Sequence, residues 1–205
     1  VDIDASAVTA VEYGYLIRNA SATNGAQYNT IKNCSITLNR GSNSATSNSS
    51  AIFQTASSTG GGVVPTNATG ANSYNKYYNL TIQNALNGVY LNGNGSYRDL
   101  SCEVGTSAAT LRNTFMNLGP TTNTFVSARG VYASQQEGVR IFNNDISAIA
   151  SDQAAAYGIY FTGCYGTANE INNNKIQNIN VKGSTSTSSS AYGIRADLPI
   201  SGTHN

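Results

Sequence analysis

The chain has 205 residues, of which only 10% are Asp, Glu, Lys or Arg, and its formal net charge is +1. Proteins typically carry about 25% charged residues, so this chain is unusually poor in charge. A balance this close to neutral offers no electrostatic attraction to nucleic acid or to an anionic membrane surface. Hydrophobic residues still make up 40% of the chain and 20 residues are glycine, so the composition predicts an ordered protein with many short turns.

The first predicted elements are short strands that share one phrase: a small residue, an aliphatic residue and usually an aromatic residue. Copies recur at intervals of about 28 to 42 residues, beginning with the degenerate Tyr13-Gly14-Tyr15-Leu16. The later copies are, in chain order, Ala51-Ile52-Phe53, Gly88-Val89-Tyr90, Gly130-Val131-Tyr132, Gly158-Ile159-Tyr160 and Gly193-Ile194-Arg195. Short runs of Ile, Val and Tyr bounded by Gly, Asn and Ser favour β-strands over helices.

A second phrase lies between copies of the first: an apolar residue, a spacer, Asn, two further residues and another apolar residue. Its copies are residues 31–36, 77–82, 111–116, 141–146 and 171–176. The apolar ends are too far apart for one face of a straight strand, so a bend is predicted at the Asn, which tolerates left-handed backbone. Stacking would then align the bend residues as a structural ladder bonded amide to amide: Asn33, Asn79, Asn113, Asn143 and Asn173.

Two alternating phrases of this kind predict an all-β solenoid of about six coils, because one coil cannot bury its apolar face alone. Ser/Thr/Gly/Asn-rich loop insertions explain the uneven spacing, and we expect them at residues 40–50, 57–75, 93–109 and 182–190. Residues 1–205 would form a single β-helix segment. Patterned residues close to both ends, without a polar cap, indicate an excerpt of a longer solenoid.

The paired phrases, as in residues 28–36 (Tyr28-Asn29-Thr30-Ile31-Lys32-Asn33-Cys34-Ser35-Ile36) and Tyr157-Gly158-Ile159-Tyr160, resemble the repeat of right-handed parallel β-helix proteins of the pectate-lyase-like superfamily. The Asn/Thr-rich, Lys-poor composition is similar to that of large secreted bacterial surface proteins, of the adhesin kind exported by the type IX system. The resemblance covers nearly the whole chain. It implies a right-handed parallel β-helix and an extracellular or cell-surface location, but no single activity, since the superfamily includes lyases, hydrolases, adhesins and passive spacers.

The acidic residues are too scattered to indicate an active site. Polysaccharide lyases and galacturonases on this fold would show clustered carboxylates, for calcium or as an acid–base pair. Only Asp2 with Asp4, and Asp99 with Glu103, are close in sequence. The second pair is either a calcium or sugar site or, as we favour, part of a loop held by local Arg–carboxylate pairs with Arg98. We expect no catalytic residue, no metal and no cofactor.

Two further features have structural interpretations. Asp145 would stack beside Lys175 as a surface salt bridge, because both occupy the same place in the second phrase. The three cysteines are either buried thiols, which we favour, or include a Cys102–Cys164 disulfide. Zinc is not expected, because the only histidine is His204.

An aromatic row is the candidate binding feature. Phe53, Tyr90, Tyr132 and Tyr160 share one position in successive copies of the first phrase, and the row ends at Arg195. Strand alternation predicts that these side chains face outward, because the residue before each is an inward aliphatic. Such a strip could bind sugar rings or another chain. Structurally, the rings could instead stack on one another as a stabiliser, or the longer loops could cover the row.

The sequence therefore predicts a non-catalytic extracellular β-helix module for adhesion, carbohydrate contact or structural display on a bacterial surface. Its partner would be a polysaccharide or another surface protein, with no nucleic acid. No membrane insertion is expected, because no stretch approaches about 18 consecutive apolar residues. The alternative is a fragment of a polysaccharide lyase or glycoside hydrolase whose catalytic coils lie elsewhere.

Overall fold

The computed structural model describes residues 1–7, 13–40, 49–121, 126–166, 168–182 and 189–198. This part of the chain is all-β, as the sequence predicted. Helix is limited to short 3-10 turns, among them η2 (Thr59–Gly61), η3 (Ala68–Gly70) and η4 (Ala109–Leu111). Short apolar runs interrupted by Gly and Asn give strands because no run is long enough to bury a helical stripe.

Strands from distant parts of the sequence pair in two large sheets. The first sheet contains β1 (Ile3–Asp4), β3 (Thr30–Thr37), β5 (Lys76–Gln83), β8 (Glu103–Gly105), β9 (Asn113–Met116), β12 (Arg140–Phe142), β13 (Asn144–Asp152), β15 (Glu170–Asn172) and β16 (Lys175–Lys182). The second contains β2 (Tyr13–Arg18), β4 (Ser50–Thr55), β6 (Asn87–Asn92), β10 (Ala128–Ser134), β14 (Ala156–Thr162) and β17 (Ala191–Asp197). A small sheet pairs β7 (Asp99–Leu100) with β11 (Gln136–Glu137).

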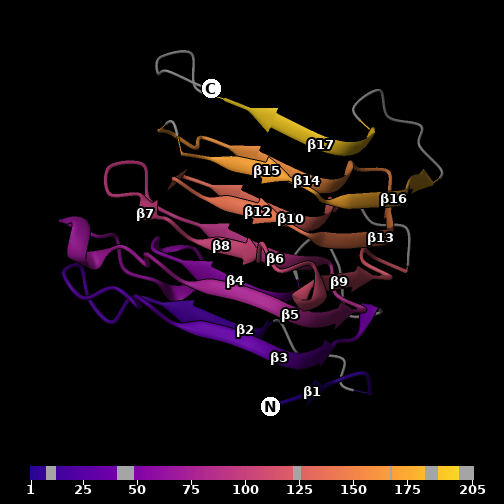
Figure 1. Cartoon of the computed structure of the whole chain (residues 1–205), viewed down its shortest axis with the longest axis horizontal. Helices are drawn as coiled ribbons and strands as arrows, with labels where there is room; N and C mark the ends of the chain where they lie inside the picture. Colours follow the sequence, from indigo (N-terminus) through magenta and orange to yellow (C-terminus); the bar gives the residue numbers. More distant parts are fainter. Residues whose placement is uncertain (8–12, 41–48, 122–125, 167, 183–188, 199–205) are drawn as a thin grey trace.

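The strand pairings of all three sheets are parallel. The chain alternates between the two large sheets. Consecutive strands of the second sheet are separated in sequence by one or two strands of the first sheet. Figure 1 shows the strands stacked from β1, at the bottom, to β17, at the top, with the two chain ends at opposite ends of the stack. This arrangement is compatible with a parallel β-solenoid.

Both sheets contribute side chains to one hydrophobic core. In each sheet, equivalent residues of neighbouring strands align, and the aligned core residues have no exposed surface. The first sheet supplies Ile36, Ile82, Phe115 and Ile146, and the second supplies Ile52, Val89, Val131 and Ile159. Burying one such side chain contributes about 1.5–3 kcal/mol, so these aligned residues supply much of the driving force for stacking.

The small residue of the first phrase lets the two sheets approach each other. Gly130 and Val131 are both buried, so the in–out alternation of β10 is interrupted at the glycine. A Cβ at Gly130 would lie 2.7 Å from Cγ2 of Ile146 and 2.5 Å from the carbonyl oxygen of Gly158. The two phrases therefore occur together because the small residue of one packs against the last apolar residue of the other.

Left-handed backbone occurs at most of the predicted bends. Asn33, Asn79, Asn143 and Asn173 have φ between 52° and 56°. A second aligned set of left-handed residues lies farther along the same strands: Asn84, Asn117, Ala148 and Asn178. The short Asn side chain can bond to nearby backbone, which lowers the cost of this conformation.

The predicted insertions are partly correct. Residues 57–75 contain η2 and η3 but no strand, as expected of an insertion. Residues 93–109 contain the short strands β7 and β8, which pair with other strands, so this segment is a loop insertion only in part. Most of the predicted insertions at 40–50 and 182–190 lie outside the described residues.

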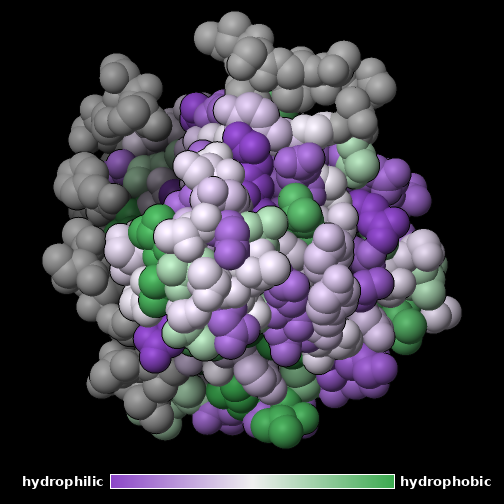
Figure 2. All heavy atoms as spheres, turned by 90° about the vertical axis from the view of Figure 1, so that its left-hand side faces the viewer, coloured by the Kyte–Doolittle hydropathy of each residue, from purple (hydrophilic) through white to green (hydrophobic). Residues whose placement is uncertain are grey.

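Hydrophobic and hydrophilic residues are interspersed on the face seen in Figure 2. The large exposed hydrophobic side chains are spread along the chain: Val1, Leu16, Tyr28, Val63, Val64, Tyr97, Ile194 and Leu198. None of the helices in the described ranges has the length and apolar character needed to cross a bilayer.

Candidate functional site: the aromatic strip of the second sheet

The predicted aromatic row occupies one register position across the second sheet. From β2 to β17, the residues paired at this position are Leu16, Phe53, Tyr90, Tyr132, Tyr160 and Arg195. In β10 the fully buried Val131 and Ala133 flank Tyr132, which is half-buried. The side chain of Tyr132 therefore lies on the outer face of the sheet.

The rings contact one another from strand to strand. The ring centroids of Phe53 and Tyr90 are 5.2 Å apart in an edge arrangement, and those of Tyr90 and Tyr132 are 4.4 Å apart. Tyr132 and Tyr160 continue the row at 5.2 Å with tilted planes. Aromatic pairs at these separations contribute about 0.5–1.5 kcal/mol beyond the area that they bury.

At Phe53 an inserted segment covers the row, which is one of the structural alternatives that the sequence left open. The exposed fraction of Phe53 is 5%, because the segment around η2 lies over it and Tyr13 stacks on it at 5.1 Å. A Cβ at Gly60, whose φ is +73°, would lie 2.3 Å from Cε1 of Phe53. The accessible aromatic residues of the row are therefore Tyr90, Tyr132 and Tyr160, which are half-buried.

A second row of aromatic residues, which was not predicted, runs beside the first. Tyr157 stacks on Tyr160 at 4.7 Å and on Tyr192 at 5.2 Å, with planes only 6° apart in the second pair. Simple alternation would place Tyr157 on the same face as Ile159. The two successive inward residues, Gly158 and Ile159, reverse this and place Tyr157 beside Tyr160. The repeated Tyr-Gly pairs at 13–14, 157–158 and 192–193 were the available signal.

Two guanidinium groups lie over the rings. That of Arg129 is 5.0 Å from the centroid of Tyr132, and Arg129 also donates to Oδ1 of Asn87 at 3.3 Å. The guanidinium of Arg195 is 5.2 Å from the centroid of Tyr160. Both positions match cation–π contacts, which favour Arg over the face of Tyr.

Asp197 completes the end of the strip. Its carboxylate accepts hydrogen bonds from Nε of Arg195 at 3.0 Å and from the hydroxyl of Tyr160 at 2.8 Å. The bond from Arg195 holds the pKa of Asp197 below its ordinary value. Burial, then the bond to Asp197, raises the pKa of Tyr160, and burial raises the pKa of Tyr90 to about 12. At neutral pH the two phenols are neutral and Asp197 is ionised.

This chemistry suits contact better than catalysis. Neutral hydroxyls, ring edges and the charge of Arg129 can bind a hydroxyl-rich surface, whereas neither phenol is poised to exchange a proton near neutral pH. Tyr157 stacks on both Tyr160 and Tyr192, so its ring is not an open platform for a sugar ring.

The predicted Asn ladder is present in part. Nδ2 of Asn79 donates to Oδ1 of Asn33 at 2.8 Å, on the exposed side of the bend. The predicted alignment is wrong at Asn113, because β5 and β9 pair with Thr81 opposite Thr114, which places Asn113 opposite Leu80. Asn113 is not among the left-handed residues. Asn143 and Asn173 adopt the bend conformation, and Nδ2 of Asn143 donates to the carbonyl of Thr106.

Asn113 belongs instead to an inner row of amides. Its Nδ2 donates to Oδ1 of Asn144 at 2.9 Å, and Nδ2 of Asn144 donates to Oδ1 of Asn174 at 2.8 Å. Asn113 and Asn144 have no exposed surface. The predicted ladder does not include this row, because Asn144 and Asn174 each follow another Asn, and only the first of each pair matches the phrase.

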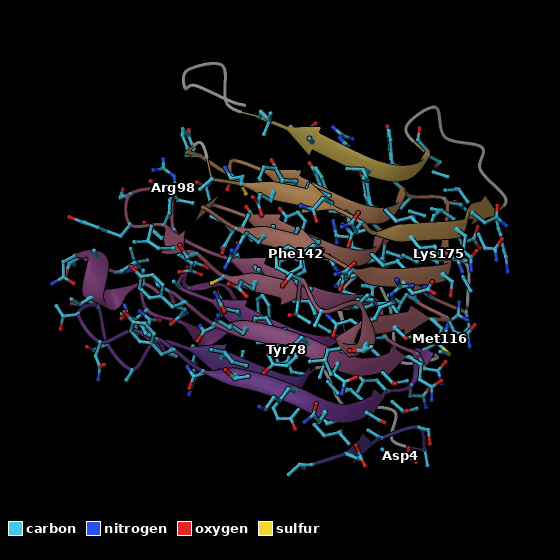
Figure 3. The ribbon with its side chains drawn as sticks, in the orientation of Figure 1. Asp4, Tyr78, Arg98, Met116, Phe142 and Lys175 are labelled. Atoms are coloured by element: carbon cyan, nitrogen blue, oxygen red, sulfur yellow. The ribbon has the colours of Figure 1, made fainter. Side chains whose placement is uncertain are left out.

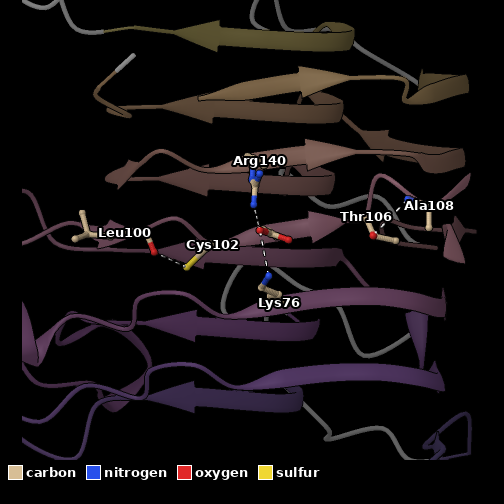
Figure 4. A network of polar contacts seen from close by, with 7 residues as sticks. Lys76, Leu100, Cys102, Thr106, Ala108 and Arg140 are labelled. Atoms are coloured by element: carbon tan, nitrogen blue, oxygen red, sulfur yellow. Dashed lines mark hydrogen bonds and ion pairs between the residues drawn. The ribbon is translucent and has the colours of Figure 1, made fainter. Parts of the chain in front are cut away.

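Asp99 and Glu103 do not form the predicted local pairs with Arg98. Glu103 lies between Lys76 and Arg140 of neighbouring strands and forms an ion pair with each, at 3.4 Å to Nζ of Lys76 (Figure 4). The guanidinium of Arg98 instead stacks on the ring of Tyr165, 3.6 Å from its centroid.

Asp99 is fully buried among amides. Its carboxylate accepts bonds from Nε2 of Gln54 at 2.7 Å, from the backbone N–H of Asn72 at 2.8 Å and, more weakly, from Nε2 of Gln136 at 3.4 Å. Burial raises its pKa from 3.8 to about 6, although these bonds oppose the rise. A carboxylate closed inside such a shell is structural.

The remaining predictions concern cysteines, charge and metals. Cys34, Cys102 and Cys164 are free and buried, so Cys102 and Cys164 form no disulfide. Burial raises the pKa of each of these two thiols to about 12.

The predicted surface salt bridge is confirmed, with Nζ of Lys175 lying 3.5 Å from Oδ2 of Asp145. Within the described ranges, no group of His, Cys, Asp and Glu side chains could hold a metal ion, and His204 lies outside them.

No family model matches the chain, and no curated protein or solved structure matches it at a significant level. The geometry of the site is therefore the basis for a functional proposal.

Proposed function

We propose that the chain is a segment of a right-handed parallel β-helix of about six coils, and that it serves as a non-catalytic extracellular module on a bacterial surface. In this proposal the strip of Tyr90, Tyr132 and Tyr160, together with Arg129, contacts a polysaccharide or another surface protein. The rest of the stack is the scaffold that displays this strip.

The continuous strip supports this proposal most directly. It joins aromatic edges, hydroxyls and a guanidinium along one sheet face, where side chains are held at the spacing of the strands. Polymers with a regular repeat are suitable partners for such a row, because several weak contacts can form at once. The carboxylates give no comparable support to catalysis, since Asp99 is enclosed and Glu103 is paired with two cations.

The test is a glycan array probed with the wild-type chain and with Tyr132→Ala. Binding that falls at least about tenfold in the variant would support the strip as the contact surface, because a central aromatic contact of this kind contributes more than about 1.4 kcal/mol. Tyr78→Ala is the matched control, because Tyr78 is a half-buried tyrosine on the first sheet (Figure 3). Equal loss in both variants, or no glycan bound by the wild type, would count against carbohydrate contact.

One observation favours the enzyme alternative, in which the chain is a fragment of a polysaccharide lyase or glycoside hydrolase. A groove of about 480 Å³ on the first sheet is lined by Lys76, Glu103, Arg140, Phe142 and Glu170. Turnover assays on pectin-like and alginate-like polymers distinguish the two functions. Cleavage at an enzyme-like rate that is lost in Glu103→Gln would overturn the non-catalytic proposal.

A further inference from the structure

Tyr28 and Tyr74 form an aromatic stack at the turns that lead into the first sheet. Their ring centroids are 4.7 Å apart and the ring planes differ by only 10°. Tyr28 comes shortly before β3 and Tyr74 shortly before β5. Tyr28 is 72% exposed and Tyr74 is half-buried. The pair therefore lies on the surface, and neither ring is part of the hydrophobic core.

Both tyrosines have left-handed backbone, which is an uncommon conformation for a bulky residue. The φ angle is 58° at Tyr28 and 62° at Tyr74, in the region where the Cβ crowds the following carbonyl oxygen. One aromatic pair contributes less free energy than two left-handed residues of this size cost. The stacking of the two rings on each other therefore does not account for tyrosine at both positions. Strained residues of this kind concentrate at ligand sites.

Small residues follow the tyrosines in the same left-handed column. Ser101 has a φ of 49° and Gly138 has a φ of 67°. The N–H of Tyr74 donates to the carbonyl of Leu100 at 2.7 Å, which places Ser101 in the next layer. The N–H of Ser101 donates to the carbonyl of Glu137 at 2.8 Å, which places Gly138 in the layer after that. The aromatic stack ends at Tyr74, because the next two side chains are too small to continue it.

A hollow of about 380 Å³ lies where further rings would continue the stack. This volume is within the range of small-molecule sites, about 300–1,000 Å³. Tyr28 covers one face of the Tyr74 ring, and the hollow lies on the side of the following layers. A Cβ at Gly138 would lie 3.4 Å from the hydroxyl oxygen of Ser101, so the glycine keeps this space open. Besides Tyr74, the lining includes Ser101, Glu137, Gly138, Gly166 and Ala168.

Two polar side chains line the hollow, those of Ser101 and Glu137, and both residues are exposed. A Cβ at Gly166 would lie 3.0 Å from Cγ of Glu137, so the glutamate side chain lies against this glycine. Within the described ranges, the carboxylate of Glu137 has no ion-pair partner. It is also the only charged group among the lining residues. An aromatic face beside a hydroxyl and a carboxylate suits a ring that has one apolar face and several hydroxyls.

We propose that this hollow binds a neutral sugar ring, stacked on the face of Tyr74 that Tyr28 leaves uncovered. The sugar hydroxyls donate to the carboxylate of Glu137 and bond to the hydroxyl of Ser101. The negative charge of Glu137 disfavours uronic acids. The hollow lies at the ends of β7 and β11, and none of its lining residues belongs to the aromatic strip of the second sheet. This site is therefore additional to the proposed contact of that strip and does not depend on it.

The test is a nuclear magnetic resonance titration of the 205-residue chain with neutral tetrasaccharides of glucose, galactose and mannose. At least one should bind and shift the amide signals of Ser101 and Gly138. Tyr74→Asn should weaken this binding at least about tenfold without lowering the free energy of unfolding, because Asn tolerates left-handed backbone. Tyr78→Asn is the matched control, since Tyr78 is a half-buried tyrosine outside the hollow, and it should retain binding.

Three results of this titration would overturn the proposal. The first is that none of the tetrasaccharides binds, and the second is an equal loss of binding in Tyr74→Asn and Tyr78→Asn. The third is a shift at the amide of Tyr132 with none at Ser101 or Gly138. That last result would support the strip as the carbohydrate contact, so a failure of this proposal is distinguishable from a failure of the proposed function.

Two further variants test the place and the charge of the site. Ser101→Tyr should extend the stack into the hollow and weaken binding at least about tenfold while Tyr74 stays in place. Tetragalacturonate should bind at least about threefold more weakly than the best neutral tetrasaccharide, and Glu137→Gln should narrow this difference. Far-ultraviolet circular dichroism verifies the fold of each variant. Full binding in a folded Ser101→Tyr, or equal binding of the acidic and neutral probes, would contradict the proposed site.

Discussion

Nδ2 of Asn113 donates to Oδ1 of Asn144 across 2.9 Å in the interior of the stack. Neither residue has exposed surface, and Nδ2 of Asn144 donates in turn to Oδ1 of Asn174. The same Asn144 amide also donates to the carbonyl of Val104 at 3.0 Å. An amide row of this kind links neighbouring strands through side chains as well as backbone, and it fixes the register because each member must meet its partner.

Removing the central amide should therefore be costly. Asn144→Ala should lower the free energy of unfolding by about 2–4 kcal/mol, since it leaves buried polar partners unsatisfied and opens a cavity. Asn79→Gly is the comparison, because it removes an exposed amide bond while keeping a residue suited to a φ of 53°. Urea unfolding should show a change of less than about 1 kcal/mol for the comparison. Equal losses would mean that burial of the inner row is unimportant.

Ala148 is a position where the natural residue fits poorly. Its φ is 52°, and the aligned Asn117 and Asn178 share this conformation. Ala148→Gly should raise the free energy of unfolding by about 0.5–1 kcal/mol, because the left-handed conformation penalises a Cβ. Ala150→Gly in the same strand should lower it by a similar amount, since Ala150 is not among the left-handed residues. Thermal unfolding of both variants checks the opposite signs.

The close approach of the sheets predicts a contrast between two glycines. Gly130→Ala should destabilise the chain by about 1–3 kcal/mol, because the new Cβ would meet a backbone oxygen at 2.5 Å and a core side chain at 2.7 Å. Gly193→Ala should instead raise the free energy of unfolding by about 0.5–1 kcal/mol, because its φ lies outside the left-handed region and a Cβ at that position meets nothing within 4 Å. A loss of stability in Gly193→Ala would contradict this difference.

Asp99 predicts a pH dependence of stability. Its pKa is about 6 in the folded chain and near 3.8 when unfolded, so between these values the folded state binds more protons. The free energy of unfolding should consequently fall as pH rises from about 4 to 6, by roughly 3 kcal/mol at most, and level off above that range. Asp99→Asn should abolish this slope in urea titrations, whereas Asp152→Asn, at a half-buried position, should retain it. A slope that survives Asp99→Asn would assign the titration to another group.

Glu103 predicts a dependence on salt. Glu103→Gln should cost about 1–2 kcal/mol at low ionic strength, because one carboxylate with 10% exposed side chain loses charge-assisted contacts to both Lys76 and Arg140. The partners are 47% and 43% exposed, so part of the loss should disappear in high salt. Parallel thermal melts at two salt concentrations measure the difference. An unchanged loss would indicate that packing and not charge holds Glu103.

Much of the fold could be predicted because the phrases repeat at every layer. The register that aligns Tyr90, Tyr132 and Tyr160 follows directly from the spacing of the first phrase. Two features could not be predicted in this way. The burial of Phe53 depends on the segment around Gly60, whose path no periodicity describes. The shift of Asn113 follows from pairing between β5 and β9, since a phrase matched by residue type cannot distinguish a bend residue from its inward neighbour.

Burial decreases from β14 to β17, so we expect these strands to differ in local stability. Residues of β14 are almost all buried, whereas β16 and β17 have only exposed and half-buried residues. In the 205-residue chain, amide hydrogens of β16 and β17 should therefore exchange with solvent before those of β6 and β10, whose residues are mostly buried.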